Sequence, residues 1–478
     1  MAANWWRMET RGWAWVAAAA VWLLAVVAGP AAADALVHEQ DLPFGPAAAA
    51  ALVDVMGDGQ PALVLAADRG VGVYAWPAGG DDGQGWQPLA LLPPLPAPPT
   101  AVGVGDVTGD GVPELAVGTG NAGAVYVLAW TGRRWTLLGQ TPYLWSPVRA
   151  LRVGDVDGNG RAELVVLSEA GQLVVFGWRD RVWHTLWRSP PAWNSVLHVE
   201  LADLTGDGHP HVILADQSGA VAVWRWPFLE PVSQGFVWGT PISMALTGLD
   251  GGQPQVMVTT NERLLYRYVW REEQLIPTGT PIHDARLPFD LMQPVPWPGE
   301  PGTIVAGQYA GGLGLWRITG AGLELLAVGR PQHPRWILAA GKERLLVGEQ
   351  GMPASLWARR PADFLELRVN GRPQPLQEPP LVSGDHVLIA MRDWAALLGL
   401  TLYWDAERQR LTAVGRGGFA ILTVGDPRLW SGQGIFSLPV APMLRAGRTY
   451  APPDLARAFG AAVAWDPRRR QLILELAR

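Results

Sequence analysis

Four short acidic loops recur along the chain, and their side chains are of the kinds that bind divalent cations. Their first aspartates, Asp54, Asp106, Asp155 and Asp203, are separated by 52, 49 and 48 residues. Calcium takes about six to eight oxygen ligands from carboxylates, amides, backbone carbonyls and water. Oxygen-bearing side chains at alternate positions of a glycine-rich turn therefore predict a cation site. The loops are VDVMGDGQPALVLA (53–66), GDVTGDGVPELAVG (105–118), GDVDGNGRAELVVL (154–167) and ADLTGDGHPHVILA (202–215).

The set of oxygen ligands differs from loop to loop. The third loop has oxygen side chains at positions 1, 3, 5 and 9, the second is nearly as complete, and the fourth has His211 where the others have an acid. The first keeps only Asp54 and Asp58. The alternative for all four is a metal-free Asx turn, in which an aspartate accepts bonds from nearby backbone N–H groups. The predicted calcium ligands are Asp155, Asp157, Asn159 and Glu163; Asp106, Thr108, Asp110 and Glu114; and Asp203, Thr205 and Asp207.

The remaining residues offer no recognisable catalytic set. The 478-residue chain has no cysteine, which removes disulfides, thiol nucleophiles and thiolate metal sites, and its one lysine is Lys342. The glycine motif GTGNAG (118–123) runs into a strand rather than a helix, which argues against a dinucleotide site. His209 and His211 share one face of a predicted strand, but no third ligand is evident. We predict no catalytic residue; the sequence favours a binding protein over an enzyme and leaves enzymatic activity open.

Residues 1–35 predict an export signal. Arg7 and Arg11 precede an uncharged run that ends at Gly29-Pro30 and small residues, and cleavage is expected after Ala33 or Ala35. An uncleaved membrane anchor is the alternative. Without residues 1–33 the chain has 35 basic and 42 acidic side chains, so it offers no basic surface for nucleic acid. We expect an extracellular or cell-surface protein, touching a membrane only if the signal is retained.

The loops belong to longer repeats. Each is followed by a glycine turn and a strand that ends in an aromatic residue, and weaker copies continue toward the C-terminus. Seven units of about 45 residues between 44 and 361 predict an all-β, seven-bladed β-propeller over residues 36–361. Residues 36–42 are expected to complete the sheet of residues 330–360. The repeated tryptophans, predicted to pack between blades, are Trp76, Trp130, Trp178, Trp226, Trp270, Trp316 and Trp357.

Other tryptophans fall between the motif units. There we expect linkers, from which exposed rings could stack on sugars. They are Trp86, Trp135, Trp145, Trp183, Trp187, Trp193, Trp238 and Trp297.

Two family resemblances follow from these motifs. The loops D-x-T-G-D-G and D-x-D-G-N-G, each before a Val/Leu-rich strand, resemble the FG-GAP/VCBS repeats of integrin-α-like propellers. Residues 362–478 contain two related halves, 379–405 and 441–466, each predicted as two strands, a short helix and a strand. They resemble the copper amine oxidase N-terminal-like stalk domain, which implies a smaller α+β domain. Trp404 and Trp465 are expected in its core.

The name of that domain does not imply an oxidase here. The quinone cofactor of amine oxidases forms from a tyrosine that follows an asparagine, and none of the eight tyrosines does so. Copper and topaquinone are therefore not expected.

These features predict a non-catalytic binding or adhesion protein at the cell surface or outside the cell. The propeller would be the recognition platform with structural calcium, and the stalk domain would attach it to the envelope or to a partner. The expected partner is a cell-wall or extracellular glycan, or a protein. The alternatives are a carbohydrate-active lyase or glycosidase on a propeller scaffold, and a structural spacer.

Overall fold

The computed structural model describes residues 34–476 with short gaps. The gaps are 56–60, 68–69, 76–86, 93, 133, 191–194, 229, 249–253, 285–286, 288–291, 296–302, 310–311, 320–321, 330, 332, 341–342 and 384–385. The predicted export signal thus lies outside the described residues except for Asp34 and Ala35. No helix in the described part of the chain is long and apolar enough to cross a bilayer.

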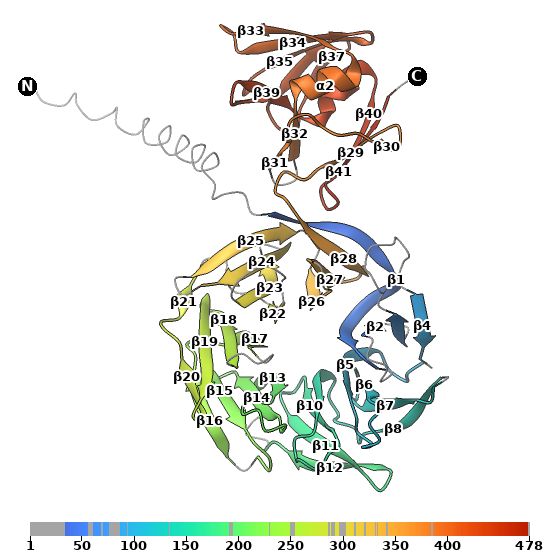
Figure 1. Ribbon diagram of the computed structural model, residues 1–478, viewed down its shortest axis with the longest axis vertical. Coiled ribbons are helices and arrows are strands. Elements are labelled where there is room, and N and C mark those ends of the chain that lie inside the picture. The colour runs from blue at the N-terminus through green and yellow to red at the C-terminus, as the bar shows by residue number, and fades with distance from the viewer. Residues whose placement is uncertain are drawn as a thin grey trace, which may run out of the picture.

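Antiparallel sheets between Asp34 and Arg360 surround a common centre (Figure 1). Four sheets follow the chain order strand by strand. They comprise β5 (Pro99–Gly105), β6 (Glu114–Thr119), β7 (Val125–Trp130) and β8 (Trp135–Gln140); β9 (Val148–Gly154), β10 (Glu163–Ser168), β11 (Leu173–Arg179) and β12 (Val182–Arg188); β13 (Val196–Ala202), β14 (His211–Asp216), β15 (Ala220–Trp224) and β16 (Pro231–Phe236); and β17 (Pro241–Thr247), β18 (Gln255–Thr260), β19 (Leu264–Arg271) and β20 (Gln274–Pro277), with β21 (Ile282–His283) beside β19.

The remaining strands of the ring form one larger sheet, because the first strand of the chain belongs to two groups at once. Its strands are β1 (Asp34–Val53), β2 (Ala62–Ala67), β3 (Gly70–Ala75), β4 (Gln87–Leu91), β22 (Met292–Pro294), β23 (Thr303–Tyr309), β24 (Gly312–Ile318), β25 (Leu323–Gly329), β26 (Pro334–Ala339), β27 (Arg344–Glu349) and β28 (Pro353–Arg360). The second half of β1 pairs with β2, while its first half pairs antiparallel with β28, from Ala35↔Arg360 to Pro46↔Pro353.

This double pairing closes the ring, as expected for residues 36–42. The strand begins at Asp34, two residues earlier than the predicted boundary, and Asp34 Oδ2 accepts a 2.7 Å bond from Arg359 Nε. Processing after Ala33 would retain this contact, whereas processing after Ala35 would remove it.

Neighbouring sheets bury one another. All six residues of β6 and of β10 are buried, and one core cluster joins Val127 of β7 to Leu164 of β10 and Phe176 of β11. Apolar residues on both faces of a middle strand require a second sheet on each side. The repeated tryptophans contribute to these cores, and Trp316 and Trp357 are fully buried. Trp76 lies outside the described residues.

The expectation for Trp135, Trp183 and Trp187 was wrong. They lie in strands β8 and β12 rather than in linkers, and Trp135 and Trp183 are only 6% and 4% exposed. Each of these two packs on the repeated tryptophan of its own sheet, with ring centroids 5.4 Å apart for Trp130–Trp135 and 5.1 Å apart for Trp178–Trp183. Trp86, Trp193 and Trp297 lie outside the described residues.

The C-terminal unit contains three further sheets and two short helices. Both halves have the predicted order of strand, strand, helix and strand, but the second helix is 3₁₀. The elements are β29 (Glu366–Val369), β30 (Arg372–Pro373), β31 (Leu381–Ser383), β32 (His386–Ala390), α2 (Met391–Leu398), β33 (Thr401–Asp405), β34 (Arg410–Gly415), β35 (Gly418–Thr423), β36 (Arg428–Ser431), β37 (Gly434–Ser437), β38 (Met443–Arg445), β39 (Arg448–Ala451), η2 (Pro453–Phe459), β40 (Ala462–Asp466) and β41 (Gln471–Glu475).

Trp404 is not a core residue of this unit. It is 42% exposed on β33, the edge strand of its sheet, and lines an open groove with Met391 and Leu444. Trp465 is partly buried against the core, as expected. Trp394 on α2 is the fully buried tryptophan, and its Nε1 donates to the carbonyl of Ala451 at 3.2 Å.

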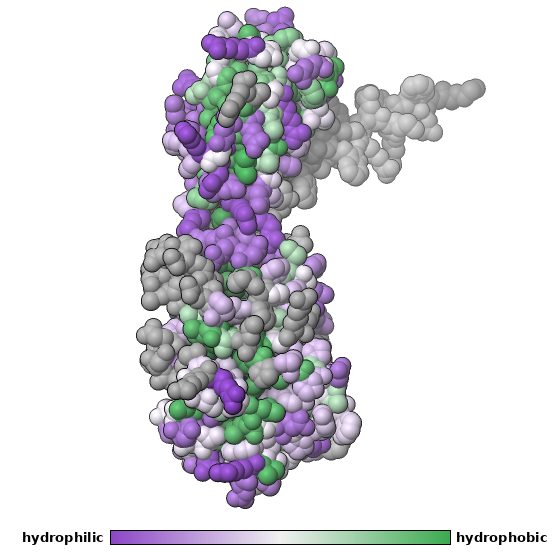
Figure 2. Space-filling view, turned by 90° about the vertical axis from the view of Figure 1, so that its right-hand side faces the viewer, coloured by the Kyte–Doolittle hydropathy of each residue, from purple (hydrophilic) through white to green (hydrophobic). Residues whose placement is uncertain are grey.

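The turn between β40 and β41 joins this unit to the ring at the closing strand (Figure 1). Arg468 accepts a 3.0 Å bond from the His38 N–H at its carbonyl, and its guanidinium pairs with Glu349, which is 1% exposed. The same guanidinium lies 5.3 Å from the Trp357 ring centroid. We call Arg468, Glu349, Trp357 and His38 the closure clamp. Figure 2 shows a mainly hydrophilic surface at this narrow junction.

The clamp predicts unequal effects for two adjacent arginines. Arg468→Ala leaves the buried Glu349 carboxylate without its guanidinium, and we expect the free energy of unfolding to fall by about 3 kcal/mol. Arg469 is 45% exposed and contacts Asp41 at 4.0 Å and His38 Nδ1 at 3.2 Å from its Nε; removing either contact leaves no buried carboxylate unpaired, so Arg469→Ala should cost about 1 kcal/mol. Denaturant unfolding measures both, and equal small losses would contradict a clamp that stabilises the ring.

Candidate metal-binding loops

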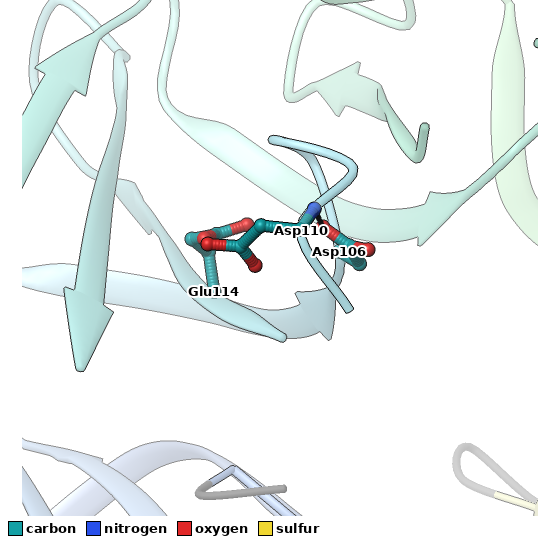
Figure 3. Close-up of side chains that lie close together, drawn as sticks. All are labelled: Asp106, Asp110 and Glu114. Atoms are coloured by element: carbon teal, nitrogen blue, oxygen red, sulfur yellow. Dashed lines mark hydrogen bonds between the residues drawn. The ribbon is translucent and has the colours of Figure 1, made fainter. Parts of the chain in front are cut away.

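In the second and third loops, three carboxylates converge. The second loop joins β5 to β6, and the third joins β9 to β10. One oxygen from each carboxylate lies within 4.8 Å of the other two in each cluster. Figure 3 shows the second-loop cluster. The clusters are Asp106, Asp110 and Glu114, and Asp155, Asp157 and Glu163.

Backbone hydrogen bonds to the first aspartate shape each loop. Asp155 Oδ1 accepts from the N–H groups of Gly158 at 2.8 Å and Asn159 at 3.0 Å, while Oδ2 accepts from Gly160 at 2.7 Å. Gly158 and Gly160 have φ of +75° and +83°, a region that disfavours any side chain. Asp106 and Asp203 make the same kind of bonds in their loops. The Asx turn is therefore present in all three and holds the acidic groups in place.

The glutamate at position 9 points from the following strand into the loop. Glu163 is 2% exposed, and its Oε2 accepts from Val156 N–H at 3.0 Å. Burial, and then the negative charges of Asp157 and Asp155, raise the pKa of Glu163 to about 7. Burial and the charge of Asp110 raise the pKa of Glu114 in the same way. These buried carboxylates are thus short of positive charge, which a hard divalent cation would supply.

Two other predicted ligands contact the position-9 glutamate. Asn159 Nδ2 lies 3.4 Å from Glu163 Oε1, and Thr108 Oγ1 lies 3.3 Å from Glu114 Oε1. Both side chains therefore lie against the clusters, and their role as cation ligands stays a prediction. Sequence reasoning missed Arg179, the last residue of β11, which pairs with Asp157 at 3.1 Å.

The fourth loop is built differently. His211 occupies the position of the acid and is 1% exposed, and Arg225 Nε lies 3.2 Å from its Nε2. Burial and the charge of Arg225 lower the pKa of His211, so a neutral imidazole and a guanidinium stand near the place of the carboxylate. Among the described residues, no three ligating groups converge here. Cation binding by Asp203, Thr205 and Asp207 stays a prediction from sequence.

The remaining candidates do not add a site. The His209 ring lies against Gly158 of the third loop: a Cβ built on Gly158 would be 3.0 Å from His209 Cε1. Within the described part of the chain, His209 and His211 do not meet a third ligand. Asp58 of the first loop lies outside the described residues.

Comparison with known families and structures agrees with this architecture. Residues 98–128 match the FG-GAP repeat, residues 155–214 an FG-GAP-like repeat, and residues 368–474 the copper amine oxidase N-terminal domain. Both resemblances drawn from the sequence are confirmed. None of the curated proteins compared with this chain matches it.

The solved structures that resemble the chain are β-propellers. The propeller domain of Cps50 (Swd1) from Myceliophteria thermophila is 14% identical with a TM-score of 0.51, and the match covers 68% of this chain and 99% of that one. The WD40 propeller domain of Doa1 is 10% identical with a TM-score of 0.48, over 68% and 98%. At such identities the first likeness shows the fold alone.

The third loop predicts a pH effect in the absence of divalent cations. The pKa of Glu163 is about 7 in the folded chain and 4.5 as its ordinary value. Between these two values the folded state keeps a proton on Glu163 that the unfolded state has released. The stabilisation of the folded state by this proton is complete below about pH 4.5 and is lost as pH rises through 7. The side chain of the Glu163→Gln variant cannot ionise. In EGTA, the Tm of this variant should therefore rise relative to the Tm of the parent as the pH increases from 5 to 8. A difference in Tm that does not change with pH would contradict this.

Proposed function

We propose that this chain is an exported binding or adhesion protein whose ring is a seven-bladed recognition platform braced by structural calcium. The seven blades are the four chain-ordered sheets and three groups within the larger sheet. The single observation that carries the proposal is the paired acidic clusters, which recur at equivalent turns of consecutive FG-GAP-type repeats. Extracellular calcium, at millimolar concentration, suits such partly exposed carboxylate loops.

Calcium in these loops would act on structure rather than on a substrate. Each cluster lies at the turn between the first two strands of a sheet, and its glutamate is buried at the start of the second strand. A bound cation would favour the ionised glutamate and join the turn to that strand. The aspartates, Asn159, Thr108 and the two glutamates would supply the oxygen ligands.

The C-terminal unit, proposed as an α+β attachment domain over residues 362–478, differs from the propeller in charge and surface. Residues 34–361 have 21 basic and 31 acidic side chains, a net charge of −10, whereas residues 362–478 have 14 and 11, a net charge of +3. A row of paired residues crosses its five-stranded sheet and includes Tyr403, Trp430 and Ile435, which are 60%, 51% and 57% exposed. An exposed apolar row supports contact with another surface.

The test is thermal unfolding of the full chain in calcium and in EGTA. A ligand that binds only the folded state stabilises it by RT ln(1 + [L]/Kd), about 2.7 kcal/mol at a hundredfold excess over Kd. We expect a clear rise in Tm with calcium, reduced by Asp155→Asn and by Asp106→Asn and further reduced by the double variant. No rise in Tm would make the loops metal-free turns and remove this support.

Two control variants separate cation binding from turn stability. Asp216 accepts from Ser218 N–H at 2.8 Å and Ala220 N–H at 3.1 Å outside either cluster, so Asp216→Asn should lower Tm without changing the calcium response. Asp203→Asn tests the fourth loop: an unchanged calcium response would leave loops two and three as the sites, and a reduced one would add the fourth.

A further inference from the structure

Two exposed aromatic pairs repeat on the rim of the ring opposite the acidic loops. In each, two aromatic residues flank a buried aliphatic one: Tyr143-Leu144-Trp145 follows β8, and Phe236-Val237-Trp238 ends and follows β16. Leu144 and Val237 are 7% and 6% exposed, whereas the four aromatic residues are exposed. Their exposed fractions are 44% for Tyr143, 82% for Trp145, 65% for Phe236 and 74% for Trp238.

The topology places both pairs on one rim. In an antiparallel meander, the first and third turns lie at one end of the strands, and the second turn and the link to the next sheet lie at the other. The acidic loops are first turns. The aromatic segments are links between sheets, and each bonds to the second turn of its own sheet: Leu144 N–H to Gly123 O at 2.8 Å, and Val237 N–H to Gly219 O at 2.9 Å.

Each segment is also fixed to the following sheet, so the rings are held rather than loose. Glu169 N–H donates to Pro147 O at 2.8 Å, and Ala170 N–H donates to Ser146 Oγ at 3.1 Å. In the other segment, Thr240 N–H donates to Asn261 Oδ1 at 2.8 Å, and Trp238 N–H donates to Tyr266 Oη at 2.9 Å.

Trp145 is held in an unfavourable backbone conformation. Its φ is +58°, which disfavours any residue with a bulky side chain, yet the ring gains little burial. Its ring centroid lies 5.7 Å from that of Tyr143 at a 40° interplanar angle, so the two rings form one platform. The strained backbone of Trp145 thus exposes its ring to solvent instead of packing it in the core. Backbone strain of this kind is typical of ligand-binding sites.

An exposed carboxylate accompanies each pair. Glu169 directly follows β10, in the turn that bonds to the Trp145 segment. Glu262 lies against Gly239, the residue after Trp238, since a Cβ built on Gly239 would be 2.7 Å from Glu262 Cγ. A sugar ring offers apolar C–H groups on its faces and hydroxyl donors at its edges. Aromatic platforms match the faces, and ionised carboxylates accept from the hydroxyls.

We propose that these two pairs bind an uncharged polysaccharide across the rim, an inference that rests on the proposed binding function and names its partner class. Two exposed aromatic pairs separated by two repeats suit a polymer, because one chain of repeating units can engage both at high effective concentration. The net charge of −10 on residues 34–361 and the two glutamates disfavour an anionic polymer.

The test is native affinity electrophoresis of the full chain in gels that contain hydroxyethyl cellulose, glucomannan, glycol chitin or dextran, with alginate as the anionic comparison. We expect retardation by at least one uncharged polymer and none by alginate. Trp145→Ala and Trp238→Ala should each weaken binding about tenfold, and the double variant about a hundredfold. Trp145→Phe keeps a ring and should retain most of the affinity.

Trp404→Ala is the matched control, because Trp404 is 42% exposed but lies in the C-terminal unit, outside the row of Tyr403, Trp430 and Ile435. It should bind as the parent does. All variants should keep the parent Tm and its calcium response, since the altered rings are exposed. Retardation unchanged in the double variant would overturn this site while leaving a binding function intact. Retardation by none of the four uncharged polymers, or by alginate alone, would overturn the polysaccharide assignment.

Discussion

Closure of the ring is the constraint on which the other features depend. Each sheet has apolar residues on both faces and is covered only by its neighbours, so an open array would expose two large apolar faces and two strand edges. The first strand removes this problem by pairing with β28 over its first half and with β2 over its second. The closure clamp adds an ion pair between a buried carboxylate and a partly exposed guanidinium at the same place. The C-terminal unit is therefore bound to the strand that closes the ring.

The closed ring also separates two kinds of surface. Because strands alternate in direction within a sheet, the acidic turns lie on one rim and the links between sheets lie on the other. Cations would stabilise the first rim, while the second presents Trp145 and Trp238 to solvent. The repeats supply more than one acidic turn and more than one aromatic link, and single residue differences make the copies unlike one another. In the fourth loop, His211 beside Arg225 stands in the place of an acid, which leaves a positive charge near the expected cation position.

Much of this arrangement could be predicted from the repeats. The spacing of the aspartates indicated the sheets, and the positions of the oxygen side chains indicated which loops would gather three carboxylates. Local sequence suffices there because the turn is held by bonds from Asp155 to N–H groups at most five residues away. The predictions failed where burial depends on distant neighbours: Trp135 is buried in a core shared with Val64, Trp183 is buried in one shared with Val127, and Trp404 lies on an edge strand.

The sequence by itself determined the repeat, the glycine-rich turns, the candidate ligands and the strand that closes the ring, because these follow from periodicity and short-range hydrogen bonding. Only the tertiary structure decided the electrostatic state of Glu163, which depends on burial beneath two other carboxylates. It alone distinguished exposed from buried tryptophans, and it alone paired Arg468 with Glu349, 119 residues apart. Desolvation and long-range contact arise from the packing of segments distant in the chain, and no local pattern encodes them.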